Sequence, residues 1–242
     1  MYQIHRIDSV SSTNDLASEM ARNGAPEGTV VIAKEQTSGR GRHGRTWLSP
    51  EGGLYLSVIL RPETPSNQVW QIGFVASLSS AEAITKLTNI PANVKWPNDV
   101  LIHGRKICGI LIEAANRTSN IQQVIVGIGI NVEARPLSDE IADKATSICA
   151  ESGRNLTAFD IEETLLQILS RRYEEYLTTG FLPILNVWNL LDCTAGREIE
   201  AHTPTRTIRG TALKVDSDGN LLVDADGEII KITVGDVLLP NC

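Results

Sequence analysis

The sequence predicts an α/β (α+β) fold, in which a mixed sheet is flanked by helices and a small β-barrel follows at the C-terminus. Short runs rich in Val and Ile recur between residues 4 and 132. Several links between these runs are too short for crossover helices, so part of the sheet is antiparallel. Segments with helical spacing of apolar residues separate the other runs. From Gly196 onward only short alternating strands and turn sequences remain, which is typical of a small barrel.

The first half of the chain supplies most of the sheet. A strand at residues 4–10 leads into a helix that begins at the capping residues 11–14 and ends at Asn23-Gly24. Strands at 29–34 and 53–60 flank a long glycine- and arginine-rich loop. A mostly apolar helix at 69–87 packs on the sheet. Further short strands follow at 94–96, 99–102, 106–113 and 122–132.

Helices dominate the next part of the chain. We expect one at 139–151, a second at 160–178 with Thr157 and Asp160 as capping residues, and one or two helical turns at 181–191. The pattern then changes to short strands near residues 192–195. This change divides the chain into a larger domain at 1–192 and a smaller one at 193–242.

Composition excludes several classes of protein. The chain has 242 residues, of which 42% are hydrophobic and 21% charged, as in ordinary globular proteins. No apolar run approaches the roughly 20 residues that cross a bilayer, and the N-terminus lacks a signal-peptide pattern, so we expect a cytoplasmic protein. The cysteines and histidines show no metal-ligand spacing, and we expect no metal site built by the protein. A net charge of -7 argues against wholesale nucleic-acid binding.

The segment at 34–45, KEQTSGRGRHGR, carries four cations and one carboxylate, a local excess of +3 in an acidic chain. Glycine lets backbone N–H groups approach a phosphate, and arginine binds phosphate or carboxylate oxygens in a bidentate fork. Ordering a loop costs about 1 to 2 kcal/mol per residue, so we expect this one to be mobile when empty and ordered by a bound anion. The alternative is a solvated basic turn.

Residues 39–44 also satisfy the G-x-G-x-x-G pattern of dinucleotide-binding loops. That site requires a helix to open on the third glycine. Here Pro50, Gly52 and Gly53 follow closely and forbid a useful helix. A protein-kinase glycine loop is excluded too, because no H-R-D or D-F-G sequence follows.

Four other segments carry residues that could bind a ligand or could serve the fold alone. Residues 12–14 offer hydroxyl and amide groups for a small polar ring, or serve only as a helix N-cap. Residues 95–99 form a stiff platform between strands, unless Trp96 is only core and Asp99 only a turn carboxylate. Lys106 heads an apolar strand, either as an anion ligand or as an edge residue. Glycines within 127–131 allow something to approach the strand closely.

None of these segments places a nucleophile beside a base, and none forms a metal cage. This absence favours a reaction in which the substrate brings its own nucleophile. Activation of a carboxylate by ATP is such a reaction, since the protein then supplies positioning and countercharge.

As a set, these segments resemble the biotin protein ligases. SSTN (11–14), QTSGRGRHGR (36–45) with Trp47 behind it, KWPNDV (95–100), KICGILIE (106–113) and GIGINV (127–132) stand in that family's order and approximate spacing. The resemblance covers essentially the whole chain. It implies a class II aminoacyl-tRNA synthetase-like catalytic domain that binds biotin and ATP at 1–192, and an SH3-like domain at 193–242.

The resemblance also implies the reaction. Biotin and ATP, with Mg2+, give biotinyl-5'-AMP and pyrophosphate, and the biotinyl group then passes to a lysine of a biotin carboxyl carrier protein. Lys106 would bridge the biotin carboxylate and the α-phosphate, and Arg40 would lie over the adenylate. Asp99 would receive or orient the acceptor lysine. Two unit negative charges 4 Å apart repel by about 4 kcal/mol at an effective dielectric constant near 20, so a bridging cation matters.

Further site residues follow from the same resemblance. Those implied for biotin are Ser12, Thr13, Asn14, Gln36, Gly39, Arg40, Gly41, Arg42, Lys106, Gly109, Gly127 and Gly129. Those implied for ATP are Arg42, Arg45, Trp47, Lys95, Asn98, Lys106 and Asn131.

The chain departs from the family pattern at His43, where some members have arginine, so the loop is less cationic and we expect mild pH sensitivity. It begins almost at the first catalytic strand, so we expect no winged-helix domain and no DNA binding. Exposed strand edges leave a homodimer open. The alternatives are a lipoate-type ligase, a non-catalytic binder of a small anion, and a single-stranded nucleic-acid module that uses the loop with Trp47.

Overall fold

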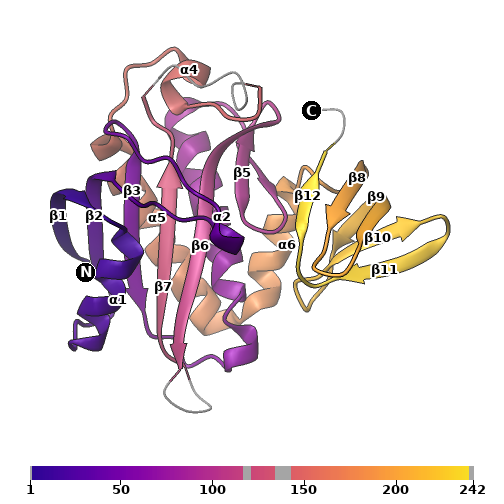
Figure 1. Cartoon of the computed structure of the whole chain (residues 1–242), viewed down its shortest axis with the longest axis horizontal. Coiled ribbons are helices and arrows are strands. Elements are labelled where there is room, and N and C mark those ends of the chain that lie inside the picture. Colours follow the sequence, from indigo (N-terminus) through magenta and orange to yellow (C-terminus); the bar gives the residue numbers. More distant parts are fainter. Residues whose placement is uncertain (1, 117–120, 134–142, 240–242) are drawn as a thin grey trace.

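The computed structural model describes residues 2–116, 121–133 and 143–239. A seven-stranded mixed sheet has the order β1-β2-β3-β7-β6-β5-β4, and a separate five-stranded sheet has the order β11-β10-β9-β8-β12. The smaller sheet lies beside the β4 and β5 end of the larger one (Figure 1). The predicted α/β fold, with a mixed sheet and a small β unit at the C-terminal end, is confirmed.

Strand pairing in the large sheet follows from the links between strands. β1 and β2 pair in parallel, because helix α1 (Thr13–Arg22) carries the chain back between them. The other neighbouring strands of the described sheet pair antiparallel. Short links predict this for β4–β5, β5–β6 and β6–β7, whereas longer stretches of chain separate β2 from β3 and β3 from β7. The strands are β1 (Gln3–Val10), β2 (Thr29–Gln36), β3 (Leu54–Leu60), β4 (Asn93–Lys95), β5 (Asp99–Ile102), β6 (Arg105–Asn116) and β7 (Ile121–Ile130).

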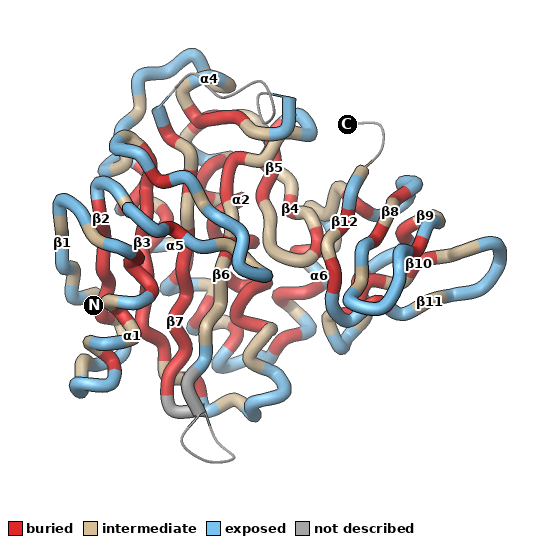
Figure 2. Tube along the Cα trace, viewed as in Figure 1, coloured by how far each residue is buried: buried red, intermediate tan, exposed pale blue. Residues whose placement is uncertain are grey.

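The two faces of this sheet have different partners. One face packs against α2 (Gln71–Thr88), α5 (Ala158–Thr179) and α6 (Phe181–Leu191) and forms the main core. Figure 2 shows β3, β7 and α2 buried along most of their length. Since each fully buried large aliphatic side chain contributes about 1.5 to 3 kcal/mol, this core dominates stability. On the other face α1 covers a small cluster of Ala17, Ala21, Val31, Ile59 and Ile125.

The smaller sheet is antiparallel throughout its described strands. It docks on the larger unit through the turn at 216–220. Trp96 Nε1 donates a hydrogen bond to the Gly219 carbonyl at 3.0 Å, and the Trp70 ring fills the space where a side chain at Gly219 would stand. Its strands are β8 (Glu198–His202), β9 (Thr207–Val215), β10 (Leu221–Ala225), β11 (Glu228–Ile232) and β12 (Asp236–Leu238).

One predicted helix is much shorter than expected. Of the span 139–151, residues 139–142 lie outside the described residues, and the helix α4 covers only Ile148–Ser152. Residues 144–146 instead run beside β6, where the Lys106 N–H donates to the Lys144 carbonyl and the Thr146 N–H donates to the Lys106 carbonyl. At residues 144–146, backbone pairing with β6 therefore takes the place of the predicted helix.

The other predicted helices agree with the structure. Asp160 Oδ2 accepts hydrogen bonds from both the backbone N–H and the hydroxyl of Thr157, so the predicted capping residues do cap α5. In the described part of the chain, no helix has both the length and the apolar character that a bilayer span requires.

Candidate active site

A cavity of about 450 Å³ lies on the face of the sheet that carries α1. The loop that follows β2 crosses in front of β7 and β6 and forms one wall (Figure 1). Strand β12 of the small sheet forms another wall. The predicted site residues that line the cavity are Ser12, Thr13, Asn14, Gln36, Arg40, Gly41, Arg42, Arg45, Trp47, Lys95, Asn98, Asp99, Lys106, Gly109, Gly127 and Gly129.

Strand register explains why residues far apart in the sequence meet here. Residues directly opposite each other in neighbouring strands point to the same face. Gly109 of β6 lies opposite Gly129 of β7, and Ser57 of β3 lies opposite Gly127. Successive residues on this face therefore leave a shallow floor of glycines beside α1.

The space above these glycines is used by other side chains of the protein. A Cβ atom at Gly127 would collide with the Asn14 amide, and one at Gly129 would stand 2.5 Å from Trp47 Nε1. A Cβ atom at Gly109 would stand 3.1 Å from Trp47 Cζ3. The family resemblance implies that these glycines leave room for a ligand. In the structure the absence of side chains at these glycines also makes room for the side chains of Asn14 and Trp47.

A buried network fixes the polar groups at the α1 end. The Ser57 hydroxyl lies 2.8 Å from Thr13 Oγ1 and 2.6 Å from Asn14 Oδ1, and can donate to one of them at a time. The Thr13 hydroxyl and backbone N–H both donate to Gln36 Oε1. Asn14 Nδ2 donates to Glu113 Oε2 at 2.7 Å. Because each partner restrains the next, the Asn14 amide is held in one orientation.

Ser12 occupies the N-cap position of α1, but its side chain makes no capping hydrogen bond. The hydroxyl is buried at the wall of the cavity. Capping therefore does not account for the hydroxyl at this position, and its role toward a ligand stays a prediction.

Carboxylates from other elements balance the cations of the loop. Arg40 forms a bidentate ion pair with Asp15, at 2.5 and 2.7 Å, and lies 3.1 Å from Glu113. The hydrogen bond from Arg40 lowers the pKa of Asp15 below its usual range. Lys34 pairs with Asp8 outside the cavity. In the folded chain these carboxylates therefore neutralise part of the loop's local positive charge. That an anion orders the loop stays a prediction.

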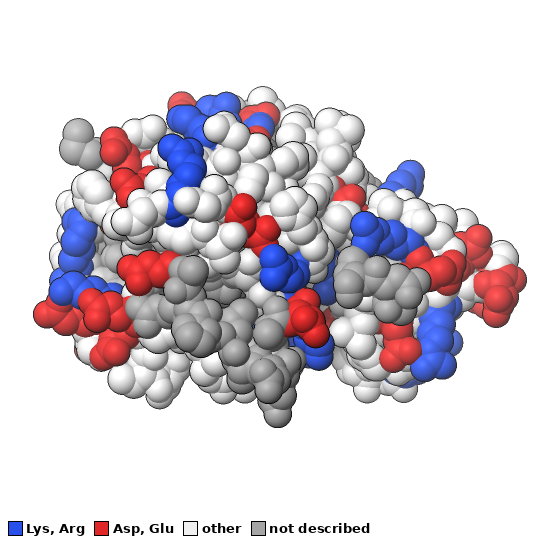
Figure 3. Space-filling view, turned by 90° about the horizontal axis from the view of Figure 1, so that it is seen from above, with Lys and Arg blue, Asp and Glu red and all other residues white. Residues whose placement is uncertain are grey.

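The surface carries no dominant basic area on the face seen in Figure 3. Within the described residues visible there, Lys and Arg groups alternate with Asp and Glu groups. On this face the basic side chains do not gather into one patch.

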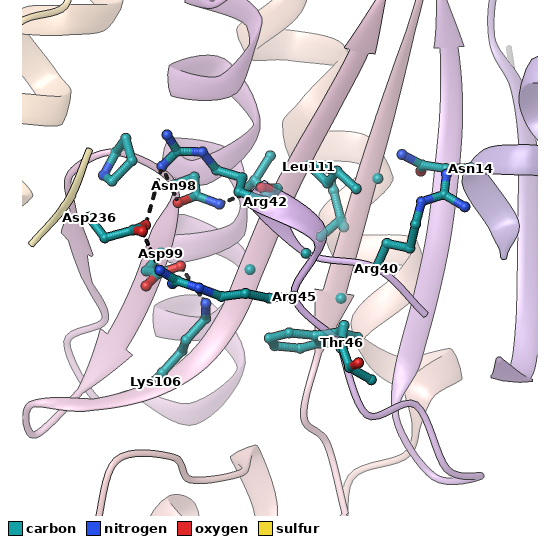
Figure 4. Close-up of a pocket in the computed structure, with 18 of the residues that line it drawn as sticks. Asn14, Arg40, Arg42, Arg45, Thr46, Asn98, Asp99, Lys106, Leu111 and Asp236 are labelled. Atoms are coloured by element: carbon teal, nitrogen blue, oxygen red, sulfur yellow. Dashed lines mark hydrogen bonds and ion pairs between the residues drawn. The ribbon is translucent and has the colours of Figure 1, made fainter. Parts of the chain in front are cut away.

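The second cluster of charges lies at the opposite end of the cavity from Asn14 and Arg40 (Figure 4). Arg42 contacts Asn98 Oδ1 at 3.4 Å, the Gly235 carbonyl at 3.3 Å and Asp236 Oδ1 at 3.9 Å. Arg45 forms a close ion pair with Asp236 Oδ2. Burial lowers the pKa of Arg42, and the nearby carboxylates partly offset the effect.

Lys106 and Asp99 complete this end. Lys106 Nζ lies 2.5 Å from Asp99 Oδ1 and 5.2 Å from the centre of the Trp47 ring. An ammonium group over an indole face is favourable. The Trp47 Nε1 atom is buried and has no hydrogen-bond partner within the described chain.

Two predicted site residues do not line the cavity. A Cβ atom at Gly39 would collide with the Trp47 carbonyl and stand 2.6 Å from Ser49 Oγ, so this glycine shapes the base of the loop. Asn131 Nδ2 donates to the Thr146 carbonyl at 3.0 Å. In this structure Gly39 lets the backbone pack closely at the base of the loop, and Asn131 binds a backbone carbonyl.

Several residues at the site were missed by sequence reasoning. Ser57 lies within the apolar run LYLSVIL and was read only as strand. Glu113 ends the segment KICGILIE, and a carboxylate on the glycine face of that strand was a usable signal. Asp15 and Asp236 gave no signal, because their partners are distant in the sequence.

Comparison with known proteins defines the class of this one. Residues 7–131 match the Biotin/lipoate A/B protein ligase family, and residues 194–239 match the Biotin protein ligase C terminal domain. The large sheet with its cavity and the small sheet beside it are thus the two parts of a protein ligase.

Relatives narrow the class further. The chain is 39% identical over 235 residues to a bifunctional ligase/repressor of Bacillus subtilis, covering 96% of this chain and 72% of the relative. It is 36% identical over 217 residues to a biotin--[acetyl-CoA-carboxylase] ligase of Paracoccus denitrificans, covering 88% and 90% of the two chains. The structure of a biotin protein ligase from Aquifex aeolicus in complex with biotin and ATP matches with a TM-score of 0.88 and 30% identity, covering 98% of each chain. The chain belongs to the biotin protein ligase family.

Proposed function

We propose that this enzyme uses ATP to activate biotin as biotinyl-5'-AMP in the cavity, and then transfers the biotinyl group to a lysine of a biotin carboxyl carrier protein. The observation that carries the proposal is the convergence of the Arg40–Trp47 loop, Lys106 and the first residues of α1, Thr13 and Asn14, on one cavity of about 450 Å³. A cavity of this size suits a small ligand.

The two ends of the cavity suit the two substrates. Thr13, Asn14 and Gln36 offer neutral donors and acceptors at one end, which suits the ureido ring of biotin. Arg42, Lys106 and their neighbours supply cations at the other end, which suits phosphates. A ligand that spans the cavity then places its carboxylate near Lys106. For the other residues implied for biotin and for ATP, we propose the binding roles that the family resemblance implies.

In the first step a carboxylate oxygen of biotin attacks the α-phosphorus of ATP. A new P–O bond forms, the bond from the α-phosphorus to the bridging oxygen breaks, and pyrophosphate leaves with its electron pair. Both reactants are anions, so Lys106 lowers their repulsion and holds them together. The protein needs no nucleophile of its own.

We propose that Mg2+ arrives with the phosphates of ATP. Among the described residues, no group of three or more His, Cys, Asp and Glu side chains is placed to hold a metal ion. Magnesium fits sites with few protein ligands, because it keeps waters and binds substrate phosphates. Asn98 and Asp99 are the oxygen-bearing side chains at the phosphate end that suit such a complex. When bound, the ion would neutralise phosphate charge.

In the second step the amine of the acceptor lysine attacks the acyl carbon of biotinyl-5'-AMP. An amide bond forms, AMP leaves, and the amine loses a proton. Asp99 is placed to orient the incoming ammonium group, because it already faces a lysine ammonium, that of Lys106. We propose residues 1–192 as the catalytic domain and 193–242 as the SH3-like domain.

A direct test is pyrophosphate release from ATP by the purified chain with Mg2+. We expect release with biotin and little release with lipoate or with no acid. Release with lipoate alone would favour the lipoate-type alternative. Pyrophosphate release that is the same with biotin, with lipoate and with no acid would contradict the proposal, and so would no release at all.

A further inference from the structure

The basic loop of the cavity is tied to the small C-terminal sheet by one carboxylate. Asp236, the first residue of β12, forms a close ion pair with Arg45 and lies 3.9 Å from Arg42. The two arginines meet different oxygens of the same carboxylate, as Figure 4 shows. The backbone beside it also takes part, since Arg42 donates to the Gly235 carbonyl.

Asp236 stands on an edge strand of the small sheet. β12 pairs with β8, Asp236 lies opposite His202, and the next residue, Val237, is buried in the small sheet. The small sheet is itself fixed to the catalytic part by the hydrogen bond from Trp96 to Gly219. The loop is braced at its base by the Gly41 N–H, which donates to the Arg45 carbonyl, and by the Arg40–Asp15 ion pair. Arg45 and its neighbours on either side are exposed, and the Arg45 side chain pairs with Asp236.

Asp236 lies where its negative charge offsets the repulsion between two arginines. Arg42 and Arg45 repel each other, which contributes to the lowered pKa of Arg42. Asp99 is the other carboxylate near Arg42, and it is paired with Lys106. Asp236 therefore stands between two like charges and brings both toward the phosphate end of the cavity.

We propose that Asp236 is a positioning residue, which holds Arg42 and Arg45 over the nucleotide end of the cavity, so that the C-terminal sheet completes the active site. This proposal rests on the proposed function for its nucleotide. The placement of the loop by Asp236 stands on the contacts alone. Asp236 acts through the arginines and touches no reacting atom.

The first test needs no catalysis. Limited digestion with trypsin of the whole chain, without ligands, is followed by mass spectrometry of cleavage after Arg40, Arg42 and Arg45. We expect Asp236→Asn to speed cleavage in this loop by about fivefold, the effect of losing a part-buried ion pair. Asp236→Glu restores protection. Glu228→Gln, an exposed carboxylate change on β11 of the same sheet, is the control and behaves as wild type.

The second test measures pyrophosphate release with biotin saturating. We expect Asp236→Ala to raise the KM for ATP by about fivefold, with kcat changed less than about twofold. In a chain that already carries Arg42→Ala and Arg45→Ala, removal of Asp236 has no further effect, because its partners are gone.

The outcomes separate this inference from the proposed function. Unchanged loop cleavage in Asp236→Asn overturns the placement of the loop by Asp236, whether or not the chain makes an adenylate. A fall in the KM for ATP, or an effect that persists in the arginine-free background, overturns the positioning role. If wild type releases no pyrophosphate, the proposed function fails, while the digestion still decides what holds the loop.

Discussion

Lys106 Nζ lies 2.5 Å from Asp99 Oδ1, across the hairpin that joins β5 and β6. The lysine expected to neutralise two acids thus already has an acidic partner within the protein. Both side chains are partly buried, and the pair holds the ammonium at the phosphate end of the cavity.

Lys106→Ala should lose most adenylate formation yet still fold. An uncompensated repulsion of about 4 kcal/mol corresponds to roughly a thousandfold in rate. Pyrophosphate release measures the loss, and thermal unfolding checks the fold. Lys34→Ala is the control, since that lysine pairs with Asp8 outside the cavity. Near-normal release from Lys106→Ala would refute the assignment.

Ser57→Ala should weaken biotin binding by about five- to thirtyfold. The change removes the hydroxyl that restrains Thr13 and Asn14, and leaves buried polar atoms without a partner at about 1 to 2 kcal/mol. Calorimetric titration with biotin measures the affinity. Ser79→Ala removes a buried hydroxyl that donates to the Val75 carbonyl in α2, away from the cavity, and should bind biotin as wild type does. Equal affinities in the two variants would sink this role for Ser57.

Gly127→Ala should also weaken biotin binding, because the new methyl group collides with the Asn14 amide, which is buried and cannot move cheaply. We expect at least about a tenfold loss, of the size that overpacking causes. Gly73→Ala, whose Cβ atom would stand 3.6 Å from Ile112, is the matched control. Biotin titration of both variants makes the comparison. If Gly127→Ala binds biotin as tightly as wild type, biotin binding does not require the space that Gly127 leaves for Asn14.

Cys108 should stay unmodified by iodoacetamide at pH 8 in the folded chain. Burial raises the pKa of this thiol to about 12, so the reactive thiolate is scarce at that pH and the side chain is also inaccessible. Peptide mapping after alkylation, with and without denaturant, gives the readout. Rapid labelling of the native protein at Cys108 would show that β6 opens readily.

The sequence predicted the strands well, because runs such as TVVIAK and GLYLSVIL combine β-branched residues with turn residues at their ends. It also predicted most of the cavity, since the glycines and cations stand in short, distinctive segments. α4 was overestimated, because the pairing of residues 144–146 with Lys106 is a tertiary interaction that helical periodicity does not contain.

The electrostatic partners at the site are what a single sequence hides. Asp15 and Asp236 look like surface carboxylates until folding brings them to Arg40 and Arg45. Ser57 looks like any polar residue in a strand until the register sets it beneath Thr13 and Asn14. The expectations of a cytoplasmic location and of no DNA binding stay predictions, and the choice between monomer and homodimer stays open.

The most direct measurement is the mass of an acceptor. A biotin carboxyl carrier domain is incubated with the purified chain, biotin, ATP and Mg2+, and its peptides are mapped by mass spectrometry. We expect one biotinyl group on one carrier lysine, and none when ATP is omitted. A carrier that stays unmodified, or one that gains the group without ATP, would contradict an account in which a cationic cavity joins biotin to AMP before transfer.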